Sequence, residues 1–181
     1  MRFSISSDDQ KLLLRYAREV LRAKLYSAPS PPAPRLETSM KSGAFVTLKE
    51  AGELRGCIGR MRENRSLSET IAEMAWAAAS EDPRFSPLEK DELPLIEIEI
   101  TILSPLEPIS PAEVEVGRHG LLISAQGRSG VLLPQVPQEF GWDRLTFLKQ
   151  LCRKAGLAPD AWESPSASLY GFEGFVFSES R

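Results

Sequence analysis

Residues Leu95–Leu103, with the sequence LIEIEITIL, decide the fold class of this chain. Four isoleucines alternate with polar residues, and this alternation is typical of a strand with one buried face and one open face. We expect the isoleucine face to meet the core. Glu97 and Glu99 are then expected to line either an open sheet surface or a cleft. The stretch therefore predicts a sheet that is covered on one side.

Signals for helices and further strands surround this stretch. Ser6–Asp9 and Ser66–Glu69 predict helix starts, because their hydroxyl and carboxylate groups cap free N–H donors. Asp143 starts a last helix, which is expected to stop at Gly156. Two hairpins and a closing strand are expected over residues 44–59, 120–134 and 172–177. Because helices and strands do not alternate strictly, the predicted fold class is α+β, with a largely antiparallel sheet flanked by helices.

Length and composition are those of one ordinary globular domain. The chain has 181 residues, 42% of them hydrophobic and 26% charged, with a net charge of −3. General nucleic-acid binding is disfavoured, because phosphate affinity comes from clustered positive charge. No apolar run approaches the ~20 residues that span a bilayer, so no membrane association is expected. The N-terminus leads into acidic residues rather than a signal peptide, and the expected location is cytoplasmic.

The stretch Leu54–Arg60 (LRGCIGR) holds the candidate reactive side chain of the sequence, Cys57. It follows the strand-like run Phe45–Leu48 across an expected loop at residues 49–53. Strand alternation would place Arg55 and Cys57 on one face. A guanidinium beside a thiol stabilises the thiolate, so we expect a reactive cysteine.

Two readings of this motif stay open. Gly56 and Gly59 lack a Cβ atom, so a ligand or another backbone segment can approach closely. The alternative is a buried structural cysteine in a strand kinked by glycine, since free cysteine is among the most buried residue types. Cys152 lies among apolar residues of the last predicted helix, and we expect it to pack there.

Two further segments carry candidate functional groups. His119, between two glycines, is either a polar turn residue or an acid–base group opposite Cys57, because a nucleophilic cysteine commonly uses a histidine that is distant in sequence. Asp82 and Arg84 flank Pro83. They either fix a loop together or present the planar fork of Arg84 to a carboxylate or phosphate. No metal-ligand spacing and no phosphate-binding loop occurs, so we expect no metal, no cofactor and no common nucleotide chemistry in this chain.

These motifs resemble the AMME-region protein domain family, in the same order along nearly the whole chain. The chain is most similar to its stand-alone prokaryotic members, which are part of AmmeMemoRadiSam systems. One departure is Gln135, where related chains can carry glutamate. Further segments that carry the resemblance are Gly117–Leu121, Leu133–Val136, Gly141–Asp143 and Lys154–Gly156.

The resemblance implies one domain over residues 1–181 with two lobes and a cleft beside the Arg-Gly-Cys motif. The larger lobe would consist mainly of residues 1–110 plus the C-terminal strand, and the smaller lobe of about 111–165. The resemblance also implies a link to two partners, a Memo-like protein and a radical S-adenosylmethionine protein, in which iron or an iron–sulfur cluster is expected. The site residues carried over are Arg55, Gly56, Cys57, Gly59, Asp82, Arg84 and His119.

Two classes of function follow from these residues. In the first, the chain is an enzyme or enzyme subunit that acts on a small or peptide-like substrate in the inter-lobe cleft. Cys57 is then a nucleophile or thiolate ligand, Arg55 its electrostatic partner and His119 an acid–base group, with Glu99 assisting. In the second, the chain is a non-catalytic module that presents a substrate or docks the partners. Arg55 and Arg84 then hold an anionic group while Cys57 only packs.

Overall fold

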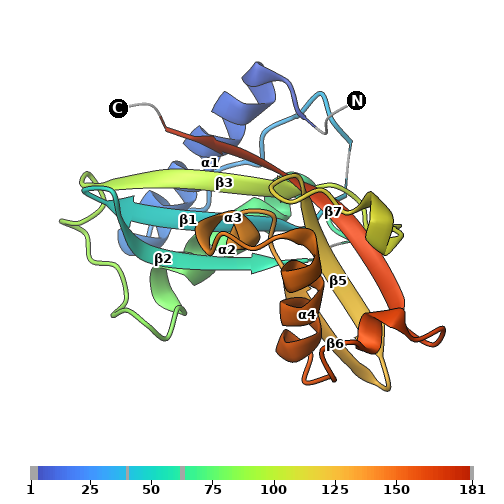
Figure 1. The fold of residues 1–181 in the computed structure, drawn as a ribbon. Coiled ribbons are helices and arrows are strands. Elements are labelled where there is room, and N and C mark those ends of the chain that lie inside the picture. Colours follow the sequence, from blue (N-terminus) through green and yellow to red (C-terminus); the bar gives the residue numbers. More distant parts are fainter. Residues whose placement is uncertain (1–3, 40, 62–63, 180–181) are drawn as a thin grey trace. The chain divides into compact units, whose positions relative to one another are not determined.

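The computed structural model describes residues 4–39, 41–61 and 64–179. The described chain divides into two compact units, each built from sheet and helix (Figure 1). The discontinuous unit consists of residues 4–103 and 175–179, and the inserted unit of residues 104–174. The inserted unit therefore begins before and ends after the smaller lobe that was expected over residues 111–165.

The elements confirm the α+β class, and every strand pairing within a unit is antiparallel. The helices are α1 (Ser7–Leu25), α2 (Leu67–Ser80), α3 (Val136–Glu139) and α4 (Arg144–Lys154), with 3-10 turns at Pro111–Glu113 and Ala161–Glu163. The strands are β1 (Ala44–Glu50), β2 (Glu53–Arg60), β3 (Ile96–Leu103), β4 (Glu107–Pro108), β5 (His119–Ala125), β6 (Arg128–Leu132) and β7 (Ser168–Ser178). Among the described helices, none has the length and apolar character needed to cross a membrane.

The sheet of the discontinuous unit has the order β2-β1-β3, with the last part of β7 beside β3. The helices α1 and α2 pack on each other and on this sheet. Ile96, Ile98, Ile100 and Ile102 are all 0% exposed, which confirms that the isoleucine face meets the core. Burial of one such side chain stabilises the fold by about 2 kcal/mol.

Side chains at the first turns of α1 and α2 fix where these helices begin. Ser6 Oγ accepts a hydrogen bond from Asp9 N (3.2 Å), and Ser66 forms the expected capping box at the start of α2. The buried Asp9 carboxylate also accepts hydrogen bonds from Glu37 N (3.0 Å) and Thr38 N (3.1 Å). The segment that follows the prolines is thereby attached to α1.

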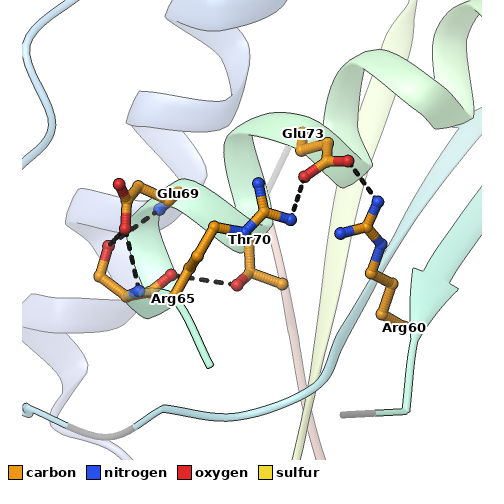
Figure 2. Close-up of polar contacts among 6 residues, drawn as sticks. Arg60, Arg65, Glu69, Thr70 and Glu73 are labelled. Carbon is orange, nitrogen blue, oxygen red and sulfur yellow. Dashed lines mark hydrogen bonds and ion pairs between the residues drawn. The ribbon is translucent and has the colours of Figure 1, made fainter. Parts of the chain in front are cut away.

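Figure 2 shows how α2 is tied to the end of β2 by Glu73. The Glu73 carboxylate pairs with Arg60 of β2 and with Arg65, which lies just before the helix. At the start of the same helix, the Glu69 carboxylate accepts a hydrogen bond from Ser66 N (3.0 Å) and completes the capping box. Because the arginines are more than 40% exposed, each ion pair contributes only about 0–1 kcal/mol to stability.

Both long hairpins turn through two residues with positive φ. Ala51 (50°) and Gly52 (86°) join β1 to β2, while Gln126 (52°) and Gly127 (72°) join β5 to β6. Two consecutive residues in this region match the twist of antiparallel strands. The first turn is shorter than the five-residue loop expected at residues 49–53.

A bulge interrupts the pairing of β1 with β2 next to the candidate site. Leu48 lies opposite Gly56, but Lys49 lies opposite Leu54. Arg55 is therefore one extra residue in β2, and the strict alternation assumed from the sequence is broken at this point.

In the inserted unit, β5 pairs with β6 on one side and with the first part of β7 on the other. Asp143 caps α4 by accepting a hydrogen bond from Thr146 N (2.7 Å), and Gly156 follows the helix at φ 70°. Both termini of this helix are as predicted. The buried core of the unit consists of Val114, Leu121, Ile123, Ala125, Phe147, Leu148, Leu151, Cys152, Ala155 and Leu157.

Candidate functional site

The Cys57 thiol lies half-buried on the side of the sheet that faces away from α2. Its neighbour Gly56 points the other way, since a Cβ atom at Gly56 would lie 2.1 Å from the carbonyl oxygen of Ala78 in α2. On β1, Thr47 lies directly opposite Cys57. The Thr47 hydroxyl donates a hydrogen bond to Cys57 Sγ across 3.2 Å.

Asp82 holds the backbone of Cys57 in place. Since β2 is an edge strand, its outward N–H groups need partners other than a strand. Asp82 Oδ2 accepts the N–H of Cys57 (2.9 Å), and the Asp82 side chain is only 2% exposed. The hydrogen bond from Arg84, assisted by that from Cys57 N, holds the pKa of Asp82 well below its usual range despite burial.

Arg84 is the cation of this centre. Its Nε and Nη2 donate to Asp82 at 2.9 and 2.7 Å, and its guanidinium lies 5.6 Å from the ring centroid of Phe85. Nη1 makes no hydrogen bond within the described chain, and the side chain is 55% exposed. Asp82 Oδ2 accepts hydrogen bonds from both Arg84 Nη2 and Cys57 N, so Arg84 lies beside Cys57. A fixed cation thus presents free donors beside a thiol.

Arg55 does not serve Cys57 in the way the sequence suggested. Its Nε and Nη2 donate to the Glu92 carboxylate at 2.8 and 3.0 Å, and its Nη1 donates to the Ser86 carbonyl at 3.0 Å. The Arg55 hydrogen bond lowers the pKa of Glu92. With all three nitrogens occupied, Arg55 ties the segment before β3 to β2. The carboxylate partner of Arg55 is thus Glu92, and neither Glu97 nor Glu99 takes this place.

The motif glycines are close-packing residues: of the two neighbours expected at them, a ligand or another segment of the chain, the structure places protein atoms there. Gly56 is buried against Ala78, as described above. A Cβ atom at Gly59 would lie 2.2 Å from the Phe45 ring. Both positions exclude a side chain because protein atoms already fill the space.

Glu99 belongs to a polar row that crosses three strands. Thr47 lies opposite Cys57 on one side and opposite Glu99 on the other, in the order β2, β1, β3. The Glu99 carboxylate pairs with Lys49 Nζ at 2.7 Å. We call Cys57, Thr47, Glu99 and Lys49 the polar row.

Four residues that contribute to this centre were missed from the sequence: Thr47, Lys49, Phe85 and Glu92. Thr47 left a weak signal, because it is a polar residue between the apolar Val46 and Leu48. Its position opposite Cys57 follows only from the bulged register.

His119 lies in the inserted unit, at the start of β5. Its Nδ1 accepts a hydrogen bond from Glu115 N (3.1 Å), so the neutral ring carries its proton on Nε2. In this tautomer Nε2 can act only as a hydrogen-bond donor. The neighbouring Arg118 is paired with Glu115 and Glu173. A role for His119 opposite Cys57 stays a prediction.

Cys152 provides a contrast within the same chain. It is 0% exposed among the apolar residues of the inserted unit, which confirms its packing role. Burial raises the pKa of the Cys152 thiol. Across the described ranges, no group of three or more His, Cys, Asp or Glu side chains is arranged to hold a metal ion.

Comparisons with known proteins agree on one family. The sequence model of the AMMECR1 family matches residues 14–177. A Methanopyrus kandleri protein is 43% identical over 98% of this chain and 91% of its own length, and a Methanosarcina mazei protein is 40% identical over 98% and 94%. The crystal structure of an uncharacterised Pyrococcus horikoshii protein matches with a TM-score of 0.84 at 35% identity, over 98% of this chain and 95% of that one.

Proposed function

The chain belongs to the AMMECR1 family, and from this premise we propose that it binds a small or peptide-like substrate with an anionic group at Arg84, on which the Cys57 thiolate acts. The observation that carries the proposal is the Asp82 carboxylate, which is 2% exposed and binds both the Cys57 N–H and the Arg84 guanidinium. One buried group thereby holds a nucleophile beside an arginine whose Nη1 is left for an anionic ligand, and such positioning favours nucleophilic catalysis.

The arrangement favours this function over a module in which two arginines hold the ligand. That alternative needs free donors on Arg55, whereas Glu92 and Ser86 occupy them. Arg84 keeps Nη1 for a carboxylate or phosphate oxygen, and Phe85 fixes the plane of its guanidinium. The proposed ligand therefore meets one arginine and one thiol.

The proposed cellular setting rests on the family resemblance alone. On that ground we propose a cytoplasmic component that works with a Memo-like protein and a radical S-adenosylmethionine protein. Co-purification of both partners with the tagged full chain from cells is the expected result. Their absence from the purified material, with each partner expressed, would contradict it.

A pair of thiol reagents tests the site directly. Iodoacetate is anionic and iodoacetamide is neutral, and both alkylate a thiolate by displacing iodide. We expect Cys57 to react faster than Cys152, and its iodoacetate-to-iodoacetamide rate ratio to fall about fivefold in Arg84→Gln, because one nearby exposed charge is worth about 1 kcal/mol. Mass spectrometry assigns the rates to each cysteine.

Arg84→Lys is the matched control, since it keeps the charge and loses the planar fork. It should retain most of the reagent preference. The rate ratio of Cys152 in the urea-unfolded chain supplies the reference for a thiol without neighbours. A ratio at Cys57 that is unchanged in Arg84→Gln, or a Cys57 that reacts no faster than Cys152, would overturn the proposal.

A further inference from the structure

We propose that Thr47 is a positioning residue for the Cys57 thiolate, which its hydroxyl stabilises by donating a hydrogen bond to Sγ. This inference rests on the proposed function, because it matters only where Cys57 acts as a thiolate. Thr47 comes from the central strand β1, ten residues before Cys57, and is not among the site residues that the resemblance implies.

Strand pairing fixes the position of the hydroxyl. Thr47 lies opposite Cys57 in the β1–β2 pair and opposite Glu99 in the β1–β3 pair. Side chains directly opposite one another in antiparallel strands have Cβ atoms about 5 Å apart. A threonine Oγ1 at this position therefore reaches the sulfur, as the 3.2 Å contact shows.

The bulge at Arg55 maintains this pairing. Regular pairing holds from Ala44↔Arg60 to Leu48↔Gly56, and the irregularity follows only after Leu48. Thr47 and Cys57 thus lie in the regular part of the hairpin, and the shift is absorbed between them and the turn. The β-branched shape of Thr47 also restricts its χ1 angle, which limits the directions of the hydroxyl.

The charged groups near Cys57 are paired with one another, so a neutral hydrogen-bond donor can add to the stabilisation of the thiolate. Asp82 and Arg84 form one ion pair beside Cys57, and Lys49 and Glu99 form another along the polar row. Arg55, on β2 itself, is paired with Glu92. Each of these cations is paired with a carboxylate of opposite charge, which offsets part of its effect at the sulfur. A donor aimed at the sulfur favours the charged form over the neutral thiol.

The test is the pH dependence of Cys57 alkylation by iodoacetamide in the full chain. We compare wild type with Thr47→Val, which keeps the branched shape, and with Thr47→Ser, which keeps the hydroxyl. Thr47→Val should slow alkylation near pH 7 about tenfold and move the half-maximal rate upward by about one pH unit, the size expected for a hydrogen bond to a charged group. Thr47→Ser should stay within about twofold of wild type.

The outcomes separate this inference from the proposed function. If wild-type Cys57 reacts no faster than Cys152, the proposed function fails. If wild-type Cys57 is fast and Thr47→Val has the same pH profile, the inference alone fails. A purely structural role would lower the melting temperature and leave that profile unmoved. If Thr47→Val does not fold, Thr47→Ala also removes the hydroxyl, and the pH dependence of its Cys57 alkylation is compared with wild type instead.

Discussion

The β1–β2 hairpin and the β5–β6 hairpin turn through the same two-residue geometry, and in each a helix approaches a glycine of the second strand. Gly56 meets Ala78 at the end of α2, and Gly130 meets Ala155 just after α4. The approach is closer in the first hairpin, where an added Cβ would lie 2.1 Å from a backbone oxygen, compared with 2.7 Å from a backbone nitrogen in the second.

The two hairpins differ in where they place a cysteine. In the first, Cys57 lies on the strand itself, on the face away from the helix, beside a hydroxyl and an arginine. In the second, Cys152 lies on the covering helix and faces the apolar core. The same packing device thus supports two thiols of different chemistry. What distinguishes a candidate site from a core is the set of groups on the uncovered face of the sheet.

The largest expected effect separates the two glycine contacts. Gly56→Ala should destabilise the protein by about 3 kcal/mol, because the new methyl group meets backbone that cannot rotate away. Gly130→Ala should cost about 2 kcal/mol. Gly127→Ala is the matched control, since nothing lies within 4 Å of its added Cβ and only its φ of 72° is strained, at about 1 kcal/mol. The free energies of unfolding of the three variants, measured with urea, should show losses in this order.

If Gly56→Ala unfolds at the same urea concentration as wild type, the close approach of Ala78 does not exclude a side chain at position 56. A larger loss in Gly130→Ala than in Gly56→Ala would reverse the comparison.

The next largest expected effect is the loss of the Asp82 carboxylate, which binds the N–H of Cys57 at the edge of the first hairpin. Asp82→Asn should lower stability at pH 7 by about 2 kcal/mol, since hydrogen bonds to a charged group are lost in a buried place. The pKa of Asp82 is lower in the folded than in the unfolded chain, so the ionised carboxylate stabilises the fold above about pH 4. That stabilisation is lost as the pH falls through the folded-state pKa.

Unfolding followed from pH 7 down to pH 2 should therefore show a constant difference between wild type and Asp82→Asn above pH 5 and a shrinking one below pH 4. Asp160→Asn is the control in the other unit, because Asp160 is exposed and its side chain makes no capping hydrogen bond. A difference that grows on acidification would contradict the role of Asp82.

The smallest expected effect compares one arginine from each hairpin. Arg55→Lys should cost about 1 kcal/mol, because lysine keeps the charge near Glu92 but loses the bidentate fork. Arg128→Lys in β6 removes one exposed hydrogen bond to the Gly156 carbonyl and should stay within about 0.5 kcal/mol of wild type. Melting temperatures measure both changes. Equal losses of stability in the two variants would mean that the contacts of Arg55 stabilise the fold no more than those of Arg128.

Features set by near neighbours in the sequence were predictable. The capping box at Ser66, the isoleucine alternation of β3 and the pairing of Asp82 with Arg84 each depend on residues at most a few positions apart. Such signals need no knowledge of the tertiary structure.

The contacts that define the candidate site were not predictable in this way. The partner of Arg55 is 37 positions away, at Glu92. The position of Thr47 opposite Cys57 depends on the register of a hairpin whose turn is shorter than the sequence suggested. Glycine at position 56 was compatible with either an open or a tightly packed surface, and only the position of α2 decides between them.

The division of the chain into a discontinuous and an inserted unit has a consequence for protein synthesis. Strand β3 leaves the ribosome before the whole inserted unit. Residues 175–178, which lie beside β3 and complete the sheet of the discontinuous unit, leave it only after the inserted unit. At ordinary translation rates of about 5–20 residues per second, this delay lasts roughly 4–14 seconds. During that time β3 has an unpaired edge, including the Ile98 N–H that Glu179 later binds. The nascent chain is therefore most open to pairing with a neighbouring polypeptide at this stage, and chaperone binding at β3 would be most useful then.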